Sequence, residues 1–287
     1  MEGKVIIVTG ANSGIGFETA KDLAARKGRV ILACRDLNRG QKATESIIKA
    51  TGNNNVVFRR LDLSSLNSVR QFASEIKKTE ERLDVLIHNA GVTPSPGKHL
   101  TEDKLELQFA TNHFGPFLLT HLLLDLMKNS APSRIVVVSS ITHHLASLDL
   151  NNLNCEKNTR HPFWIYCSTK LANILFVREL AKRLQGTGVT VNALHPGGVK
   201  TAIARNSQGI IKYFIIPVVY FFLKDSVSGA QTSIYLAVSD EVKNTTGQYF
   251  VDCKPAWISR LARDETKAKL LWNLSEKLTD PLRRVIL

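Results

Sequence analysis

The sequence lacks the features that mark secreted, zinc-binding or membrane-spanning chains. Its 287 residues include only four cysteines, and none of them forms a CxxC pair or a zinc-ligand spacing with histidine. We therefore predict reduced thiols, no metal site and a cytoplasmic location. The N-terminal apolar run Val5–Val8 is too short for a signal peptide. The apolar stretch Ile210–Leu223 contains Lys212 and Pro217, and it is shorter than the ~20 residues that a transmembrane helix needs.

Acidic residues are few relative to basic ones. The chain has 25 Asp and Glu against 38 Lys and Arg, which gives a formal net charge of +13. The basic residues are scattered and no recognition motif accompanies them, so we expect no nucleic-acid partner. Three interpretations of the charge remain open: a solvated basic surface, a basic cleft for a polyanionic cofactor, and a basic face in peripheral contact with anionic lipid.

The chain has no low-complexity segment, internal repeat or Pro/Gly-rich linker, which predicts a single domain over residues 1–287. Within it, nearly unbroken apolar runs alternate with helical stretches, and such runs are typical of strands covered on both faces. The alternation predicts an α/β fold: a doubly wound, Rossmann-type parallel sheet of about seven strands with helices on both faces. The expected strands are Val5–Val8, Val30–Ala33, Val56–Phe58, Val85–Ile87, Ile135–Val138, Val189–Ala193 and Tyr249–Val251. The expected helices include Gly16–Arg26, Arg39–Ala50, Ser68–Lys77, Leu105–Met127 and Thr169–Leu184.

The segment 202–228 departs from this alternation because it contains the apolar stretch Ile210–Leu223. Three interpretations of the stretch remain open. It could form a buried helix pair under the sheet edge, a lid over an apolar substrate, or a patch that dips into a membrane.

A glycine-rich turn follows the first expected strand and directly precedes a helical pattern. Glycines at such a turn allow a tight bend and let a pyrophosphate approach the backbone. The N-terminus of the following helix offers free N–H groups and a partial positive charge to the phosphates. Because the turn lies between a strand and a helix, its context favours a phosphate-binding site over an ordinary turn. The predicted contacts are Gly10, Asn12, Ser13, Gly14, Ile15 and Gly16.

Tyr166 and Lys170 are four residues apart, a spacing that places both on one face of a helix. A nearby ammonium lowers the pKa of a tyrosine from its usual ~10, which would make Tyr166 a useful proton donor and acceptor. Ser140 follows the expected strand Ile135–Val138, and the carboxyl ends of parallel strands are where such sheets bind ligands. Its hydroxyl could stabilise negative charge on a substrate oxygen. Strand alternation favours Ser140 over its neighbour Ser139.

Several motifs together resemble the short-chain dehydrogenase/reductase family over essentially the whole chain. They are the GxxxGxG spacing of the turn, the triplet Asn89-Ala90-Gly91 and the pattern Tyr166-x-x-x-Lys170. Within that family, the sequence is most similar to the retinol dehydrogenase branch. The stretches that carry this similarity are Ala33-Cys34-Arg35-Asp36, Thr111-Asn112-His113-Phe114-Gly115, Ser139-Ser140 followed by His143-His144, Tyr166-Cys167-Ser168-Thr169-Lys170-Leu171-Ala172-Asn173, and His195-Pro196-Gly197.

The resemblance implies a role for each matching residue. Lys170 would bind the nicotinamide ribose besides tuning Tyr166, and Asn112 would hold a water molecule in a proton relay. The implied catalytic residues are Tyr166, Lys170, Ser140 and Asn112. The implied cofactor contacts beyond the glycine turn are Asp62 and Leu63 at the adenine, Asn89 with Ala90 and Gly91 near the adenine ribose, Tyr166 and Lys170, and Pro196, Gly197, Val199 and Thr201 on the nicotinamide side.

The end of the second expected strand bears on the choice of nicotinamide cofactor. A site for NAD usually places an acidic residue there, on the ribose 2′-hydroxyl. The resemblance puts Cys34 at that position, and Arg35, which comes next, could pair with a 2′-phosphate. We therefore predict NADP(H), with Asp36 in the acidic role as the rival interpretation. His88 replaces the asparagine more usual in its motif, and we expect no effect on the site.

The resemblance also implies a class of substrate and leaves alternatives open. It favours a lipophilic alcohol or carbonyl compound, with retinol and retinal foremost. A steroid, a quinone or another carbonyl compound is an alternative substrate, and a non-catalytic NADP(H)-binding sensor or scaffold is an alternative function. In this family the helix Leu105–Met127 and the helix after Tyr166 often form a homodimer interface, and whether they do so here stays open.

Overall fold

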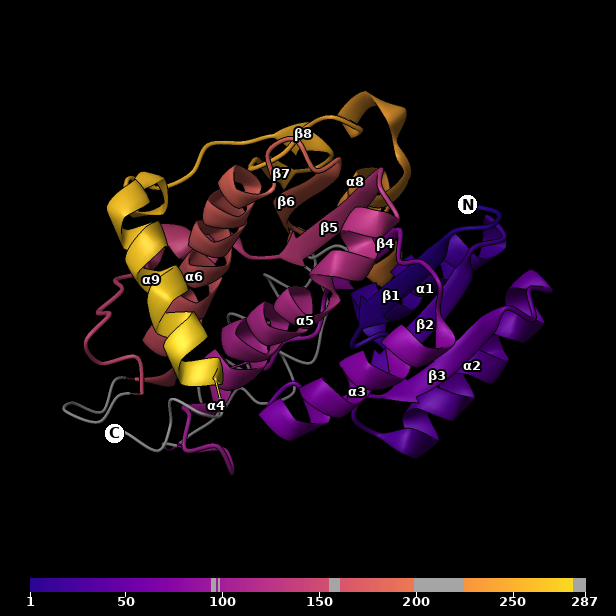
Figure 1. The fold of residues 1–287 in the computed structure, drawn as a ribbon, viewed down its shortest axis with the longest axis horizontal. Coiled ribbons are helices and arrows are strands. Elements are labelled where there is room, and N and C mark those ends of the chain that lie inside the picture. Colours follow the sequence, from indigo (N-terminus) through magenta and orange to yellow (C-terminus); the bar gives the residue numbers. More distant parts are fainter. Residues whose placement is uncertain (94–96, 98, 155–160, 199–224, 281–287) are drawn as a thin grey trace, which may run out of the picture.

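A parallel sheet forms the centre of the structure, and helices cover both of its faces (Figure 1). This computed structural model describes residues 1–93, 97, 99–154, 161–198 and 225–280. Within these residues the sheet has eight strands in the order β3-β2-β1-β4-β5-β6-β7-β8, and β8 alone is antiparallel to its neighbour. The strands are β1 (Val5–Thr9), β2 (Arg29–Cys34), β3 (Val56–Arg60), β4 (Val85–His88), β5 (Ser133–Val138), β6 (Val189–His195), β7 (Tyr249–Val251) and β8 (Lys254–Pro255).

The helices divide into two layers. One layer contains α1 (Gly14–Ala25), α2 (Leu37–Thr51) and α8 (Ser226–Val238). The other contains α3 (Leu66–Thr79), α5 (Gly115–Asn129), α6 (Pro162–Arg183) and α9 (Glu265–Thr279). The short elements are α4 (Leu107–Phe109), the π-helix η1 (Ala110–Phe114) and the 3₁₀ helices η2 (Ile141–Leu145), η5 (Asp240–Val242) and η6 (Leu261–Arg263). The predicted doubly wound α/β fold is thereby confirmed.

The apolar strands divide their side chains between the two layers. In β1, Val5 and Ile7 join the cluster under α3, α5 and α6, whereas Ile6 and Val8 join the cluster under α1, α2 and α8. This alternation follows from the two-residue period of a strand, and burial on both faces explains why the run shows no polar positions. All seven predicted strands are present. The short β8 was not predicted, because two residues after a turn leave no periodic signal.

The predicted helix Leu105–Met127 is not one continuous helix. It is divided into α4, the π-helix η1 and α5. Two local features explain the division. Pro116 lies in the first turn of α5 and has no N–H to donate to the preceding turn. The side chain of Asn112, within η1, forms two hydrogen bonds with the backbone of Val92, outside the helix. The helix predicted over Thr169–Leu184 begins earlier, at Pro162, so that Tyr166 lies inside α6.

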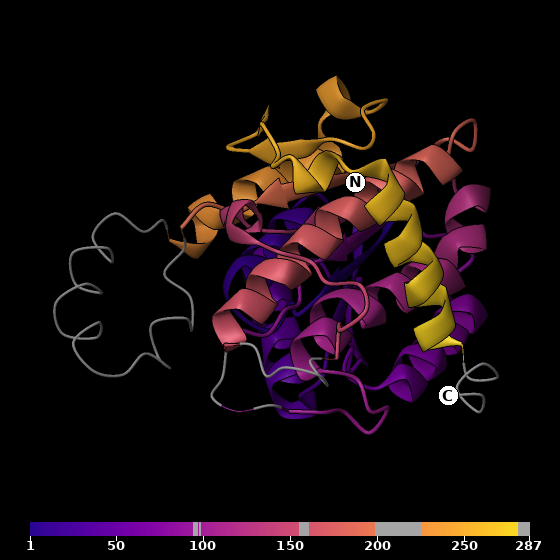
Figure 2. The same cartoon turned by 90° about the vertical axis from the view of Figure 1, so that its left-hand side faces the viewer.

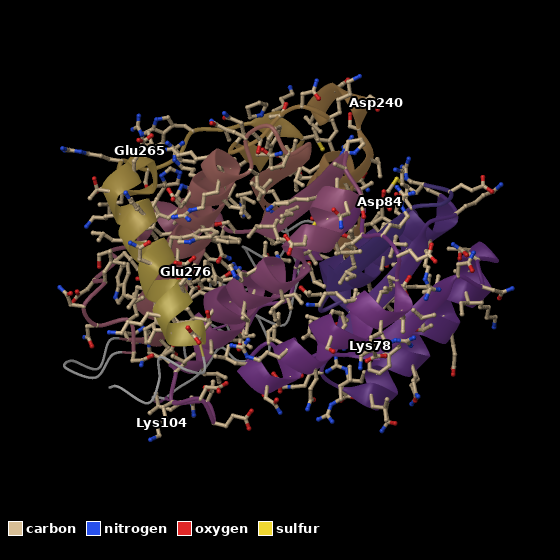
Figure 3. The ribbon with its side chains drawn as sticks, viewed as in Figure 1. Lys78, Asp84, Lys104, Asp240, Glu265 and Glu276 are labelled. Atoms are coloured by element: carbon tan, nitrogen blue, oxygen red, sulfur yellow. The ribbon has the colours of Figure 1, made fainter. Side chains whose placement is uncertain are left out.

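The C-terminal helix α9 packs along α6 and also touches α5 (Figure 2). Figure 3 labels Glu265 and Glu276 near its two ends. Glu265 forms an ion pair of 2.9 Å with Lys182 of α6, and the Arg183 guanidinium lies 4.3 Å from the centre of the Trp272 ring. α9 therefore covers part of the α5–α6 face for which the family resemblance suggests a homodimer contact.

The apolar segment predicted over 202–228 falls almost wholly outside the described residues. Its described part, from Asp225 onward, caps and begins α8: the Asp225 carboxylate accepts a hydrogen bond from the Ser228 N–H at 2.7 Å. Among the described residues, no helix combines the length and the apolar character that are needed to cross a bilayer.

Candidate active site

The glycine-rich turn brings the end of β1, the start of α1 and the end of β4 into close contact. Gly10 and Gly14 have φ angles of +67° and +60°, a region that side chains disfavour. A Cβ atom on Gly10 would lie 2.9 Å from the Ala90 Cα, and one on Gly16 would lie 2.6 Å from the Gly10 carbonyl oxygen. The Ser13 side chain does not cap α1, so it does not occupy the N–H groups of the first turn. This bare turn suits the close approach of a pyrophosphate.

Thr9, which sequence reasoning did not single out, organises this junction. Its hydroxyl accepts hydrogen bonds from the N–H groups of Asn89 and Ala90 at 3.1 and 3.0 Å. The Asn89 amide in turn donates to the Thr9 carbonyl oxygen at 2.9 Å. The amide that the resemblance assigns to the adenine ribose is thus also a brace between β1 and β4. A buried threonine at the end of a strand was the available signal.

The end of β2 carries basic side chains on its solvent side. Burial raises the pKa of the Cys34 thiol to about 11, whereas the backbone of Ala11 and Asn12 and the charge of Arg39 act in the opposite direction. The Cys34 side chain therefore faces the glycine turn. The Asp36 carboxylate accepts a hydrogen bond from the Arg39 N–H at 2.9 Å and caps α2, which argues against the rival role for Asp36. Arg35 and Arg39 are exposed there.

A third basic residue, Arg60, lies at the same edge of the sheet. It ends β3 and is paired in register with Cys34. Arg60 is exposed. Neither Arg39 nor Arg60 was predicted as a site residue. The positions of Arg39 on the first turn of α2 and of Arg60 at a strand end were the signals that could have found them.

Ser140 and Tyr166 meet at the carboxyl end of β5. Their side chains form a hydrogen bond, and the Ser140 hydroxyl also accepts the Thr142 N–H at 3.2 Å. Ser139, the competitor, points away: its hydroxyl donates to the Lys170 carbonyl oxygen at 2.7 Å within the core. The structure therefore brings Ser140 and not Ser139 to the tyrosine.

Lys170 lies one helical turn after Tyr166, as the spacing predicts. Its side chain is 5% exposed, its Nζ donates to the Val138 carbonyl oxygen at 3.1 Å, and it lies 5.5 Å from the centre of the Tyr166 ring. Burial lowers the pKa of Lys170 to about 8. The amine is therefore held by the backbone end of β5 and faces the ring of the tyrosine.

The electrostatics of Tyr166 differ from the expectation. Burial raises the pKa of Tyr166 to about 12, and the hydrogen bond with Ser140 opposes this shift. The prediction of a pKa below the usual value is wrong, because loss of water around the phenol outweighs the hydrogen bond that lowers the pKa. The phenol is therefore protonated at neutral pH and holds its proton more tightly than an ordinary tyrosine does.

Asn112 is 2% exposed and lies in the π-helix η1. Its Oδ1 accepts the Val92 N–H at 2.8 Å, and its Nδ2 donates to the Val92 carbonyl and to the Thr169 hydroxyl, both at 3.1 Å. A Cβ atom on Gly91 would lie 3.3 Å from the Asn112 Oδ1 and 3.6 Å from the Lys170 Nζ. Asn112 and Lys170 thus both lie close to Gly91.

The remaining predicted cofactor contacts are placed as follows. The Asp62 carboxylate accepts hydrogen bonds from the Ser64 N–H and hydroxyl at 2.9 and 2.6 Å, and the Leu63 side chain is buried in the core. An adenine could therefore meet Leu63 through its backbone. Pro196 and Gly197 follow the end of β6, where Gly197 has a φ angle of +87°. Val199 and Thr201 lie outside the described residues.

His143 is a further buried residue at the site, which sequence reasoning mentioned only as part of a similarity. Its Nδ1 lies 2.8 Å from the Ser140 carbonyl oxygen, and its Nε2 lies 3.4 Å from the Ser259 N–H. Because the Ser259 N–H can only donate, Nε2 accepts and Nδ1 carries the proton. His143 therefore links the backbone of Ser140 to the chain that follows β8.

Comparison with known proteins agrees with this geometry. The family profile described as short chain dehydrogenase matches residues 4–209. Retinol dehydrogenase 11 of Mus musculus is 47% identical over 275 residues, which cover 96% of this chain and 86% of that protein. Retinol dehydrogenase 14 of Homo sapiens is 46% identical over 298 residues, which cover 99% and 88%.

The chain belongs to the short-chain dehydrogenase/reductase family. It is similar to the retinol dehydrogenases in particular, and it is an oxidoreductase acting on CH–OH groups with a nicotinamide cofactor, as the family does. Among solved structures of similar fold is an uncharacterized protein from Mycobacterium Paratuberculosis, with a TM-score of 0.79 and 34% identity over 97% of this chain and 94% of that one. Another is a short chain dehydrogenase from Escherichia coli CFT073 complexed with NADPH, with a TM-score of 0.68 and 25% identity over 88% and 98%.

Proposed function

We propose that this short-chain dehydrogenase uses NADP(H) and transfers hydride between the nicotinamide and a lipophilic alcohol or carbonyl compound, with retinol and retinal as its substrate pair. The observation that carries the proposal is the hydrogen-bonded pair of Ser140 and Tyr166, with the buried Lys170 beside it. The names of the relatives support the choice of retinoids as substrates, because proteins called retinol dehydrogenases match almost the whole chain at 45–47% identity.

The chain's own residues would handle the proton. The nicotinamide supplies hydride when a carbonyl is reduced and accepts it when an alcohol is oxidised. Tyr166, which is protonated at neutral pH, would donate its proton to the carbonyl oxygen during reduction. Ser140 would donate a hydrogen bond to the same oxygen. Lys170 would stabilise the negative charge that remains on Tyr166, and Asn112 would hold the water through which that proton is replaced.

Three arginines support NADP(H) over NAD(H). Arg35 and Arg39 follow the end of β2, and Arg60 ends the neighbouring β3, at the edge of the sheet where the 2′-phosphate of the adenine ribose would lie. A guanidinium suits a phosphate group in both charge and geometry. Asp36, which could have bonded a 2′-hydroxyl, caps α2 instead. The similar fold of a short chain dehydrogenase complexed with NADPH is consistent with this preference.

The test is the oxidation of NADPH and of NADH in the presence of all-trans-retinal, for the wild type and for Tyr166→Phe. We expect turnover with NADPH that falls about 10²- to 10⁴-fold in the variant, the usual contribution of a positioned general acid. Tyr235→Phe is the matched control, because Tyr235 lies on α8 and its hydroxyl donates to Glu241 of η5, away from the site. This control should keep wild-type turnover.

Other outcomes of the same assay would replace parts of the proposal. Equal turnover with NADH would contradict the role of Arg35. Turnover with a steroid, a quinone or another carbonyl compound but not with retinal would keep the mechanism and change the substrate. Tight NADPH binding without turnover on any carbonyl compound would indicate a sensor or a scaffold.

We also infer that the protein is cytoplasmic and makes peripheral contact with anionic membranes. The net charge of +13 and the exposed side chains of Trp164 and Trp257 support this location. Sedimentation with vesicles tests it. Binding to vesicles with anionic lipid that weakens as salt is added is the expected result, and equal recovery in the supernatant with and without vesicles would contradict it.

A further inference from the structure

A second buried histidine, His113, lies directly beside the candidate relay residue Asn112. It is 2% exposed, and its ring is surrounded by the rings of Phe114, Phe117 and Phe176 at 5.2, 6.3 and 6.2 Å between centres. An imidazole in such an apolar cage is neutral and must find partners for its polar atoms within the protein. The identity of those partners connects the site to the C-terminal helix.

The first partner of His113 is Ser275 of α9. The His113 Nε2 lies 2.9 Å from the Ser275 hydroxyl oxygen. That hydroxyl donates its single hydrogen to the Leu271 carbonyl oxygen at 2.7 Å, so its oxygen can only accept from the ring. His113 therefore carries its proton on Nε2 and donates it to Ser275. Ser275 is completely buried, and no water can replace it without rearrangement.

The second partner of His113 leads toward the lysine. The ring also forms a hydrogen bond with the side chain of Asn173. The Asn173 Nδ2 lies 3.5 Å from the Val138 carbonyl oxygen, the same oxygen that accepts from the Lys170 Nζ at 3.1 Å. A chain of polar contacts thus runs from the C-terminal helix, through His113, to the backbone atom that holds Lys170.

The π-helical turn that carries Asn112 needs such support. π-helical turns are rare and commonly occur at functional sites. A change of this turn to α-helical register would turn Asn112 by about 100° about the helix axis. That rotation would break its bonds to Val92 and Thr169 and remove it from Lys170. His113 lies in the same turn, so a hydrogen-bond partner that holds the His113 ring in place also holds the turn in its π-helical form.

The C-terminal helix is a fixed partner because other contacts hold it in place. Trp272 stacks on Phe176 of α6 with 6.0 Å between ring centres, and it meets Phe117 of α5 at 4.9 Å. Glu265 pairs with Lys182 at the start of α9. Several contacts together hold α9 in place, so that Ser275 presents its hydroxyl to His113 even when one of them is weakened.

We propose that Ser275 is a positioning residue: through His113, it holds the turn of Asn112 and thereby sets the distance between Asn112 and Lys170. The inference rests on the proposed function for its consequence in turnover, since it assumes that Asn112 and Lys170 take part in proton transfer. The structural link from Ser275 through His113 to the turn of Asn112 does not depend on the proposed function, and it can be measured without a substrate.

The first part of the test compares turnover with cofactor binding. In Ser275→Ala, kcat for the NADPH-dependent reduction of a carbonyl compound should fall about tenfold, because small displacements of reacting groups are costly. The Kd for NADPH, measured by quenching of protein fluorescence, should stay within about twofold, since the glycine turn is remote from α9. His113→Gln, whose amide can still donate to Ser275, should retain most of the turnover, whereas His113→Leu should lose as much as Ser275→Ala. The double variant Ser275→Ala/His113→Leu should be no slower than either single variant.

A matched control separates positioning from the stability of α9. Trp272→Phe weakens the packing of α9 and leaves both partners of the Ser275–His113 bond in place. It should lower Tm while keeping kcat near the wild-type value. A kcat that is unchanged in Ser275→Ala, or that falls equally in Trp272→Phe, would overturn the proposal.

The second part of the test requires no substrate. Hydrogen–deuterium exchange of a peptide that covers residues 107–117 should be faster in Ser275→Ala than in the wild type, and unchanged in Trp272→Phe. If the wild type reduces no carbonyl compound, the proposed function fails and this exchange measurement alone decides the inference. Unchanged exchange in Ser275→Ala would overturn the positioning role whatever the activity.

Discussion

The buried histidines predict that this protein loses stability in mild acid. Burial lowers the pKa of His88 to about 3 and of His113 to about 4, from the ordinary value of 6.5. The unfolded chain therefore binds protons on these residues as the pH falls below about 6.5, whereas the folded chain does not until the pH reaches the lowered values. The free energy of unfolding is therefore highest when the histidines are neutral in both states, at pH 7, and it falls progressively as the pH decreases across this window.

The size of the loss follows from the shifts. At pH 5 each histidine has removed about 2 kcal/mol from the free energy of unfolding, and the two together about 4 kcal/mol. A domain is usually stable by about 5–15 kcal/mol, so that this loss is a large fraction of the total. Between pH 5 and 6, each histidine contributes a slope of about 1 kcal/mol per pH unit.

Urea unfolding at pH 7, 6 and 5 measures this slope. His113→Gln should lower the slope between pH 5 and 6 by about 1 kcal/mol per pH unit, whatever its effect on stability at pH 7. His121→Gln, an exposed position on α5, is the matched control and should leave the slope near that of the wild type. A slope that does not differ between His113→Gln and the wild type would refute the reasoning.

Two further predictions concern the site. Arg35→Ala and Arg39→Ala should each weaken NADPH binding about tenfold or more and leave NADH binding nearly unchanged, because a charge-assisted hydrogen bond contributes about 1.5–3 kcal/mol. Isothermal titration with both cofactors measures the two affinities. Equal losses for NADPH and NADH would argue against a 2′-phosphate contact. Ser140→Ala should lower kcat about 10²- to 10³-fold, as loss of one donor to a developing oxyanion does. Ser139→Ala should lower Tm with a much smaller effect on kcat. Similar kcat values for the two variants would contradict the assignment of Ser140 as the donor to the substrate oxygen.

Most strands could be read from the sequence because they are apolar runs that are buried on both faces, as β1 and β4 are. The glycine turn and the Tyr166–Lys170 spacing could also be read from the sequence, because each is a pattern of residues that lie close together along the chain. The turn lies between β1 and α1, and Tyr166 and Lys170 both lie in α6. The choice between Ser139 and Ser140 rested on alternation and on the family resemblance, and it depends physically on which hydroxyl is buried in the core. Ser139 is the serine whose hydroxyl is buried in the core, where it donates a hydrogen bond to the backbone of α6.

Features that depend on contacts between distant segments were not readable. The π-helical turn of Asn112 is held by Val92, which precedes it by 20 residues, and by Thr169 in α6. The pKa of Tyr166 depends on how completely the fold buries the phenol, and the spacing to Lys170 carries no information on burial. Ser275 is an ordinary polar residue in the sequence, and its role becomes visible when α9 is seen against η1.

The transfer of hydride from the cofactor to retinal is the central claim, and isotopic labelling tests it most directly. The protein would be incubated with all-trans-retinal and NADPH that carries two deuterium atoms at C4 of the nicotinamide, and the product would be analysed by mass spectrometry. The proposed function predicts retinol that is one mass unit heavier than the unlabelled product, formed by the wild type and by Tyr235→Phe and nearly absent with Tyr166→Phe. Retinol without deuterium, or labelled retinol formed equally well by Tyr166→Phe, would contradict it.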